Sequence, residues 1–296
     1  MILNVSGRTD IVAFYTEWFM KRYEEGFVDV RNPFYPKNIS RISFKNVDVI
    51  VFCTKNPMPI VDKIEKIKIP IIFHITLTSY KDDIEPNVPN KSMVINAIKQ
   101  IANKIGKDRI YIRYDPIFLN NKYNVEYHIK AFDRMCSLLE GYTNSIIVSF
   151  IDDYKNVRNN IDVLRLKKFS IKDLREIGIN FSKSARKYGM SVQTCSEENR
   201  LTEYGFICRD CVTKEIVKDV SGKEYTKKWR ARNNKNCSCV EMVDIGVYNS
   251  CKHFCKYCYA NYDERKVNQN FLKHDVNSSL LIGNINEYDV IKERIK

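Results

Sequence analysis

Short apolar runs rich in Val, Ile and Phe recur along this chain of 296 residues, and a helical pattern follows most of them. Runs of this length and composition are typical of strands that are buried on both faces. They are Ile2–Ser6, Val47–Thr54, Ile71–Leu77, Arg109–Asp115, Ile146–Ile151, Met190–Cys195 and Val243–Tyr248. Strands that alternate with helices form parallel sheets. The alternation therefore predicts an α/β fold, as a full or partial parallel βα barrel.

Helical patterns lie between these runs. The first is expected to begin after Asp10, a suitable N-cap, and to end at Gly26. The others are Lys91–Ile105, Asn124–Glu140 and Ile171–Lys187, each with apolar residues on one face. A small hairpin is expected after the first helix, formed by Phe27–Arg31 and Ile39–Phe44.

Residues 196–242 interrupt this alternation, because they are polar, basic and rich in cysteine. We expect them to be an insertion stiffened by metal rather than another βα unit. The predicted organisation is a barrel domain made of residues 1–195 and 243–296, with residues 196–242 as a cysteine-rich insertion.

The ten cysteines are unevenly distributed, since eight of them lie between Cys195 and Cys258. No apolar run approaches the roughly 20 residues that cross a bilayer, and the N-terminus lacks the pattern of a signal peptide. A cytoplasmic protein without membrane contact is the expectation. Clustered cysteines in a reducing compartment bind metal or carry out redox chemistry more often than they form disulfides.

Cys251, Cys255 and Cys258 have the spacing Cys-x3-Cys-x2-Cys. Three thiolates on one short loop can bind three irons of a [4Fe-4S] cluster, which leaves the fourth iron open to a substrate or cofactor. The alternative is zinc, which prefers a fourth Cys or His ligand. His253 lies inside the loop and is poorly placed to join all three thiolates.

This spacing, with aromatic Tyr257 before the last cysteine, is similar to the signature of the radical S-adenosylmethionine (radical SAM) superfamily. The resemblance implies that S-adenosylmethionine binds the open iron and is reductively cleaved to a 5′-deoxyadenosyl radical, which abstracts hydrogen from a substrate. It also implies a one-electron reductant such as flavodoxin or ferredoxin. It assigns neither the substrate nor a catalytic residue.

The motif is unusually placed, because members of the superfamily normally carry it after the first barrel strand. Circular permutation explains this position, with the cluster-bearing strand last in sequence. Val243–Tyr248 is then expected to pair in parallel with Ile2–Ser6. The resemblance would place the cofactor against the residues that end and follow that first strand, which are Ser6, Gly7, Arg8, Thr9 and Asp10.

The whole chain is similar to a bacterial radical SAM-like family of unassigned function. The similarity rests on the segments SGRTDI, TKNP, RYDPI, CSE and DIGVYNSCKHFCKYCYAN. A weaker similarity, limited to Tyr257-Cys258-Tyr259 beyond the thiols, relates the motif to DNA-repair photoproduct lyases.

Polar residues at other predicted strand ends are further candidates, because parallel-sheet enzymes place their chemistry at the carboxyl ends of strands. Lys55 and Arg8 are suited to holding a carboxylate or phosphate of the cofactor or substrate. Arg113 and Asp115 share one face of their strand, and either a structural ion pair or a role at the site is consistent with that.

A second set of cysteines suggests an auxiliary site. The family resemblance points to Cys195, Cys211, Cys237 and Cys239, whereas spacing alone favours Cys208 as a ligand. A second [4Fe-4S] cluster is the expected occupant, with zinc or unligated thiols as alternatives.

The formal net charge of +13 favours an anionic partner such as nucleic acid, although the lysines are spread along the chain. The segment Lys223–Lys235, which contains Trp229, combines cationic and aromatic side chains that suit single-stranded bases. Two other functions remain open beside the radical SAM enzyme: a zinc-containing nucleic-acid-binding module without enzymatic activity, and an iron-sulfur electron-transfer protein.

Overall fold

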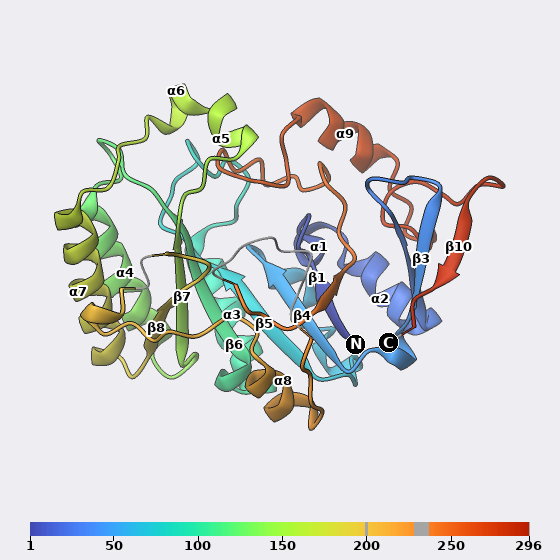
Figure 1. Ribbon diagram of the computed structural model, residues 1–296, viewed down its shortest axis with the longest axis horizontal. Helices are drawn as coiled ribbons and strands as arrows, with labels where there is room; N and C mark the ends of the chain where they lie inside the picture. Colours follow the sequence, from blue (N-terminus) through green and yellow to red (C-terminus); the bar gives the residue numbers. More distant parts are fainter. Residues whose placement is uncertain (199–200, 228–236, 296) are drawn as a thin grey trace.

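A parallel sheet of seven strands forms the centre of the molecule (Figure 1). The computed structural model describes residues 1–198, 201–227 and 237–295. The strands follow the order β8-β7-β6-β5-β4-β1-β9. Their bounds are β1 (Ile2–Val5), β4 (Val49–Thr54), β5 (Ile71–Thr76), β6 (Ile110–Ile117), β7 (Ser145–Phe150), β8 (Ser191–Thr194) and β9 (Met242–Asp244).

The predicted parallel α/β fold is confirmed, but the sheet is not a closed barrel. Within the described part of the chain, β8 and β9 stand at opposite edges and do not pair with each other. A full barrel was one of the two forms expected, and this form is wrong, because the seven strands stop short of closure.

Strand β9, the last strand of this sheet in the sequence, pairs in parallel with β1, the first, as predicted. Ile2 is opposite Met242 and Asn4 is opposite Asp244. Strand β9 is shorter than the run of apolar residues suggested. Its end coincides with Asp244, whose carboxylate accepts a hydrogen bond from the amide of Gly246 at 2.6 Å and turns the chain out of the sheet.

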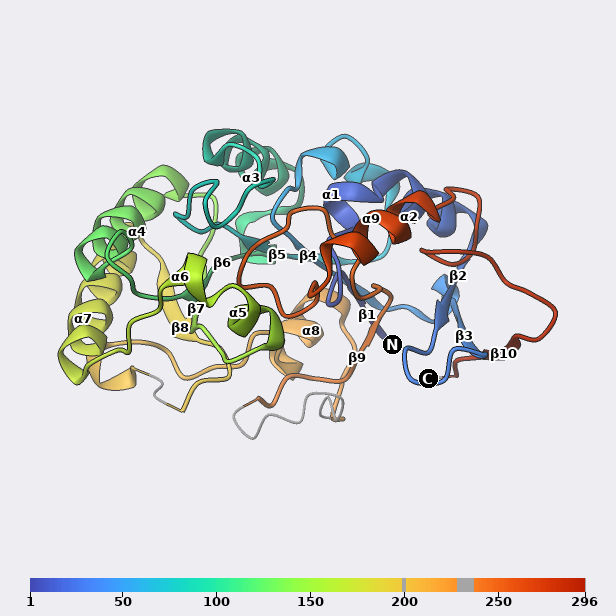
Figure 2. The same ribbon diagram turned by 90° about the horizontal axis from the view of Figure 1, so that it is seen from above.

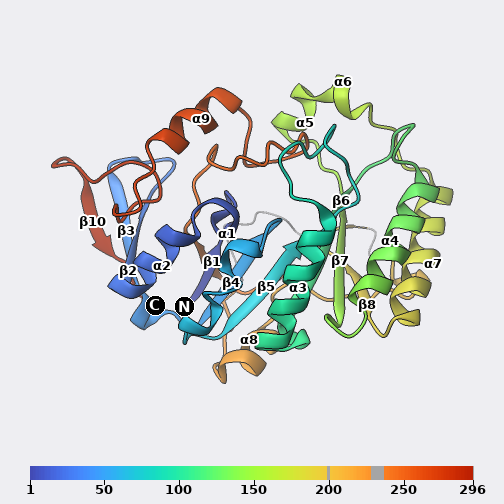
Figure 3. The same ribbon diagram turned by 180° about the vertical axis from the view of Figure 1, so that it is seen from behind.

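Five helices cover one face of the sheet, in an arc that Figure 2 shows from above. They are α1 (Ile11–Phe14), α2 (Thr16–Glu25), α3 (Lys91–Ile105), α4 (Val125–Leu139) and α7 (Ile171–Lys187). In Figure 3, which views the molecule from behind, α3 lies in front of the strands and α4 lies beside β7. The predicted helices are confirmed, with Asp10 capping the amide of Ala13 and Gly26 in the left-handed conformation. The first one is broken at Tyr15 into α1 and α2.

The alternation of side chains along the strands gives two apolar layers. On the helix-covered face, Leu3, Phe52 and Phe73 pack with Phe132 and Phe181 from the helices. On the opposite face, a second cluster contains Ile2, Val49, Val51 and Ile72 together with Ile216 and Val217 of α8 (Lys214–Ser221). Helix α8 belongs to the predicted insertion and was not expected. The insertion therefore covers part of the face of the sheet that lies opposite the five helices.

A second sheet lies beside the first one. The predicted hairpin is confirmed as β2 (Phe27–Arg31) and β3 (Asn38–Ser43), and β10 (Val290–Glu293) adds to it in parallel. The remaining helices are α5 (Lys155–Asn159), α6 (Ile161–Leu164) and α9 (Glu264–Leu272), with 3-10 turns at Phe44–Asn46, Met58–Ile60, Ile64–Lys66, Lys107–Arg109 and Thr202–Tyr204. Of the helices that the structure describes, none has the length and apolar character needed to cross a membrane.

Candidate functional site

A cavity of about 960 Å³ lies at the carboxyl ends of the parallel strands. It contains nearly all of the site residues expected from the sequence, and these come from segments far apart in the chain. Lining residues are Cys251, Cys255, Cys258, Cys195, Cys211, Cys239, Ser6, Gly7, Arg8, Thr9, Asp10, Lys55, Arg113 and Asp115. Both sets of cysteines thus face one space. Cys237 and Cys208 are the two predicted ligands that do not line it.

The loop that carries Cys251, Cys255 and Cys258 (the cluster loop, residues 249–261) is held by its own hydrogen bonds. The amide of Asn249 donates to the carbonyl of Ala260 at 2.9 Å, and the side chain of Asn261 donates to the carbonyl of Cys251. Asn270 of α9 donates to the carbonyl of Asn249 at 2.9 Å. These bonds join the two ends of the loop to each other and to α9.

Burial favours the protonated form of the three thiols. It raises the pKa of Cys255 to about 12, although the nearby Lys55 ammonium lowers it in part. Burial likewise raises the pKa of Cys251 and of Cys258. Thiols of this kind become thiolates on binding metal, which replaces the proton.

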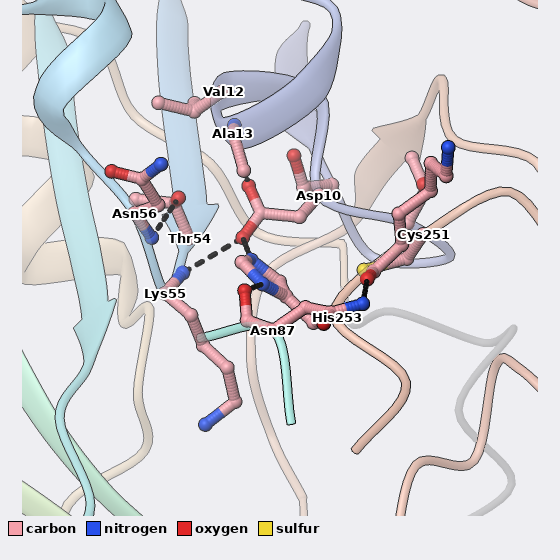
Figure 4. A network of polar contacts seen from close by, with 12 residues as sticks. Asp10, Val12, Ala13, Thr54, Lys55, Asn56, Asn87, Cys251 and His253 are labelled. Carbon is pink, nitrogen blue, oxygen red and sulfur yellow. Dashed lines mark hydrogen bonds and ion pairs between the residues drawn. The ribbon is translucent and has the colours of Figure 1, made fainter. Parts of the chain in front are cut away.

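His253 and Asp10 join the cluster loop to the end of β1 (Figure 4). His253 Nε2 lies 3.0 Å from Asp10 Oδ2, and its Nδ1 lies 3.0 Å from the carbonyl oxygen of Asn87. The same Asp10 carboxylate accepts from the amide of Lys55 at 2.8 Å and from the amide of Ala13 at 2.9 Å. Both ring nitrogens of His253 are thus engaged, and neither is directed at the thiols as a fourth ligand.

The segment Ser6–Asp10 is fixed to the loop at further points. The hydroxyl groups of Thr9 and Ser250 are 2.8 Å apart, and Tyr259 donates its hydroxyl proton to the carbonyl of Gly7. Ser6 has a φ of 96°, which turns the chain sharply where β1 ends. Its hydroxyl accepts a hydrogen bond from the amide of Ile11 at 2.8 Å. The predicted cofactor segment and the cluster loop consequently form one connected structure.

Gly7 occupies a position that has no room for a side chain. A Cβ atom there would lie 1.6 Å from Asp244 Oδ2. Asp244 in turn accepts hydrogen bonds from Arg8 Nε at 3.3 Å and from Asn4 at 3.2 Å. Burial raises the pKa of Asp244, and Arg8 opposes that rise. Arg8, expected to hold an anion, is therefore paired with an acid of the neighbouring strand.

Three of the auxiliary cysteines, Cys195, Cys211 and Cys239, also line the cavity. Cys195 Sγ and Cys211 Sγ are 2.8 Å apart. Cys211 also contacts Cys239, and Cys239 contacts Cys237, so the four thiols form a continuous chain. Cys208 is exposed, in contrast to the other four. This arrangement favours the set Cys195, Cys211, Cys237 and Cys239 over any set that includes Cys208.

Asp210 is a further candidate ligand that the sequence patterns did not suggest. A carboxylate oxygen of Asp210 and the sulfurs of Cys237 and Cys239 all lie within 4.8 Å of one another. Of the described residues, no other His, Cys, Asp or Glu trio meets this limit. The three thiols of the cluster loop accordingly do not all lie within this limit of one another.

Arg113 and Asp115 form the ion pair that was one of the two expected roles. Arg113 Nη2 lies 2.5 Å from Asp115 Oδ2, and Nη1 donates to Cys211 Sγ at 3.4 Å. Burial alone would raise the pKa of Asp115, but Arg113, Ser149 and Lys55 together lower it below its ordinary value. The pair thus places a guanidinium group directly beside the auxiliary thiols.

Lys55 is paired with Glu85, a residue that the sequence patterns did not single out. The Lys55 ammonium lies 2.8 Å from Glu85 Oε1, and that of Lys91 lies 2.5 Å from Glu85 Oε2. Burial would raise the pKa of Glu85, but the two ammonium groups lower it well below its usual range. No local pattern reveals this cluster, because Glu85 lies in a connection between β5 and α3.

The cations that line the cavity are all paired with acids in the described structure. The remaining two pairs are Arg31 with Asp289 at 2.5 Å and Arg294 with Glu241 at 3.9 Å. The lining therefore offers no excess of positive charge to a polyanion. Part of the basic segment Lys223–Lys235, including Trp229, lies in residues 228–236, outside the described residues.

Comparison with known protein families matches residues 2–260 to a model described as a domain of unknown function (DUF1848). The match includes both sets of cysteines. No curated protein matches the chain.

Proposed function

The chain belongs to the DUF1848 family, and from the geometry of its site we propose that it is a radical SAM enzyme. Cys251, Cys255 and Cys258 would bind a [4Fe-4S] cluster with one iron left open. The substrate of the enzyme is unassigned.

The observation that carries this proposal is a set of three cavity-facing thiols on one loop, which in the described part of the chain form no compact group with a fourth His, Cys, Asp or Glu donor. His253 is the nearest alternative donor in the loop, and its two nitrogens are bonded to Asp10 and Asn87. Tetrahedral zinc sites have Zn–S distances of about 2.3 Å, which place their sulfurs roughly 4 Å apart. The wider spread of these three thiols suits a cluster of several irons better.

The surroundings of the thiols support a bound S-adenosylmethionine. A cavity of about 960 Å³ is large enough for a ligand of this size. The segment Ser6–Asp10 follows the strand beside the cluster-bearing one, which is the place that a permuted partial βα barrel would give to the cofactor-binding strand. Backbone groups of this segment and the polar side chains of the lining are suited to the amino-acid and ribose parts of the cofactor.

When bound, the cluster and S-adenosylmethionine would supply the one-electron cleavage that starts radical chemistry. The protein itself would bind the thiolate ligands, orient the cofactor and keep bulk water from the reacting atoms. Its network around Asp10 ties both binding elements together, so that cluster and cofactor are held in a fixed relation. A one-electron reductant such as flavodoxin or ferredoxin would have to reduce the cluster.

The auxiliary thiols would hold a second [4Fe-4S] cluster, and binding it would require Cys195 Sγ and Cys211 Sγ to move apart from their separation of 2.8 Å. Cys195, Cys211 and Cys239 line the same cavity, and Cys237 completes the set. The contact with Cys211 lowers the pKa of Cys239, but the contact with Cys237 and burial raise it, to about 11. A single zinc ion bound by Cys237, Cys239 and Asp210 is the competing arrangement at this site.

Metal analysis after anaerobic purification tests the proposal. We expect about eight irons and eight sulfides in the wild type and about four of each in C251A/C255A/C258A. Addition of S-adenosylmethionine should change the electron paramagnetic resonance (EPR) spectrum of the reduced wild type and leave that of the variant unchanged. Zinc without iron would contradict the proposal and favour a zinc module. Iron without any response to S-adenosylmethionine would favour an electron-transfer protein.

A further inference from the structure

A buried carboxylate holds two lysines next to the cluster loop. Glu85 is 1% exposed, and it accepts hydrogen bonds from Lys55 at 2.8 Å, from Lys91 at 2.5 Å and from Thr78 at 2.6 Å. Tyr257, between the last two cysteines of the cluster loop, donates its hydroxyl proton to the same carboxylate. Four donors from four separate segments thus meet at one acid.

This group carries an excess positive charge, because two ammonium groups share one carboxylate. The Lys91 side chain is 30% exposed, so solvent offsets part of this excess, whereas Lys55 is 13% exposed and depends more on an opposite charge nearby. Lys55 reaches from Glu85 into the cavity lining, and Cys255 is among the groups whose negative charge it faces. Thiolates that bind a cluster at Cys251, Cys255 and Cys258 would supply the missing negative charge.

The position of the group relative to the loop is fixed by the chain around Glu85. The amide of Lys256 donates to the carbonyl of Ile84 at 3.0 Å, and the Asn87 side chain donates to the carbonyl of Lys252 at 2.8 Å. Asn87 also bonds to His253 through its own carbonyl oxygen. Residues 84–87 are therefore hydrogen-bonded to the cluster loop on both sides of Glu85. These bonds keep Glu85 next to the loop, unlike a flexible acid on the surface.

We propose that Lys55 provides a fixed positive charge that favours the reduced state of the cluster at Cys251, Cys255 and Cys258, with Glu85 as the positioning residue that holds it there. This inference rests on the proposed function. Reduction adds negative charge to a cluster, so a neighbouring ammonium stabilises the reduced form and raises the reduction potential. Lys55 has no direct part in breaking or forming a bond of the substrate.

Two substitutions of opposite electrostatic sign separate this role from a structural one. K55M removes the positive charge and keeps most of the side-chain volume, whereas E85Q removes the negative charge and keeps an amide oxygen that can still accept a hydrogen bond from Lys55. Redox titration followed by EPR, on anaerobically purified full-length protein, measures the potential of this cluster, whose signal is the one that S-adenosylmethionine changes. We expect a more negative potential in K55M, a less negative one in E85Q and a value near wild type in K55R.

The control is K122M, because Lys122 is exposed and pairs with Asp83 away from the cavity, at 3.0 Å. Its potential should equal that of the wild type. Shifts of the same sign in K55M and E85Q, or no shift in either, would overturn the inference. If K55M does not retain its cluster, E85Q alone decides, since only a less negative potential agrees with the proposal. A wild type without iron would instead refute the proposed function, so the two failures are distinguishable.

Discussion

Asp10 and His253 are 243 residues apart in the chain and hydrogen-bond at 3.0 Å, at the point where the first strand of the sheet meets the cluster loop. The pairing of β1 with β9 brings them together. Asp10 also caps α1 and binds the amide of Lys55, so one carboxylate links three segments around the cavity.

D10A should destabilise the protein by about 2 kcal/mol or more and reduce its retention of iron. The loss of an N-cap costs about 1 kcal/mol, and the unpaired His253 and Lys55 groups add to that cost. The matched control is N124A, because Asn124 caps α4 by accepting from Tyr127 at 2.9 Å. Urea unfolding and iron analysis of both variants check this. Equal iron retention in D10A and N124A would contradict the linking role of Asp10.

G7A should weaken the site by steric conflict with Asp244. A Cβ atom at residue 7 would lie 1.6 Å from the Asp244 carboxylate, so either that carboxylate or the segment Ser6–Asp10 must move. We expect a loss of stability of about 1–3 kcal/mol. In G7A/D244A the closest conflict is removed and only the contact with Asn4 Nδ2, at 2.6 Å from the Cβ, is left, so the double variant should be more stable than the sum of the single effects predicts. Additive losses in urea unfolding would show that the contact is not the cause.

His128 should make the protein less stable as the pH falls below its ordinary pKa. Burial lowers the pKa of His128 to about 4 from 6.5, although its hydrogen bond to Phe118 opposes this. Between these two pH values the unfolded chain binds more protons than the folded one, so the free energy of unfolding rises with pH. The contribution present above pH 6.5 is lost towards pH 4, at up to about 1.4 kcal/mol per pH unit.

Unfolding of the wild type and H128Q at a series of pH values isolates this effect. His128 lies on α4 and bonds to Tyr114 and Phe118, away from both sets of cysteines. The difference in unfolding free energy between the two proteins should shrink as the pH falls from 6.5 to 4. A difference that is constant over this range would rule out the titration of His128 as the cause.

Single cysteine variants should identify the auxiliary ligands. C195A, C211A, C237A and C239A are expected to lower the iron content from about eight towards four per chain. C208A, at an exposed position, is the matched control and should keep the wild-type iron content. Loss of iron in C208A, with full retention in C195A, would show that the spacing of the sequence motif is the better guide to the ligands.

The sheet and its helices were predictable because burial imposes a pattern on the sequence. Strands covered on both faces need apolar residues at nearly every position, as in Ile71–Thr76, whose first five residues are buried. Helix α8 escaped prediction because its apolar residues, Ile216 and Val217, stand in a polar and cysteine-bearing stretch. Closure of the sheet is set by the number and tilt of strands, which such patterns do not encode.

At the site, the sequence predicted those residues that belong to a recognisable motif or stand at the end of a predicted strand. The cysteine spacing and the strand ends led to Cys251, Arg113 and Lys55. The partners of these residues gave no such signal, because Glu85 and Tyr257 meet across 172 residues of sequence. The positive net charge of the chain was also a poor guide to the cavity, since its cations are balanced by acids placed opposite them.

Formation of 5′-deoxyadenosine is the measurement that tests the central claim most directly. Anaerobically purified protein would be reduced with dithionite and incubated with S-adenosylmethionine, and the product quantified by chromatography and mass spectrometry. The account predicts 5′-deoxyadenosine from the wild type and none above background from C251A/C255A/C258A, with C136A, altered at a buried cysteine of α4, as the active control. A wild type that contains its iron and forms no 5′-deoxyadenosine under these conditions would contradict the account.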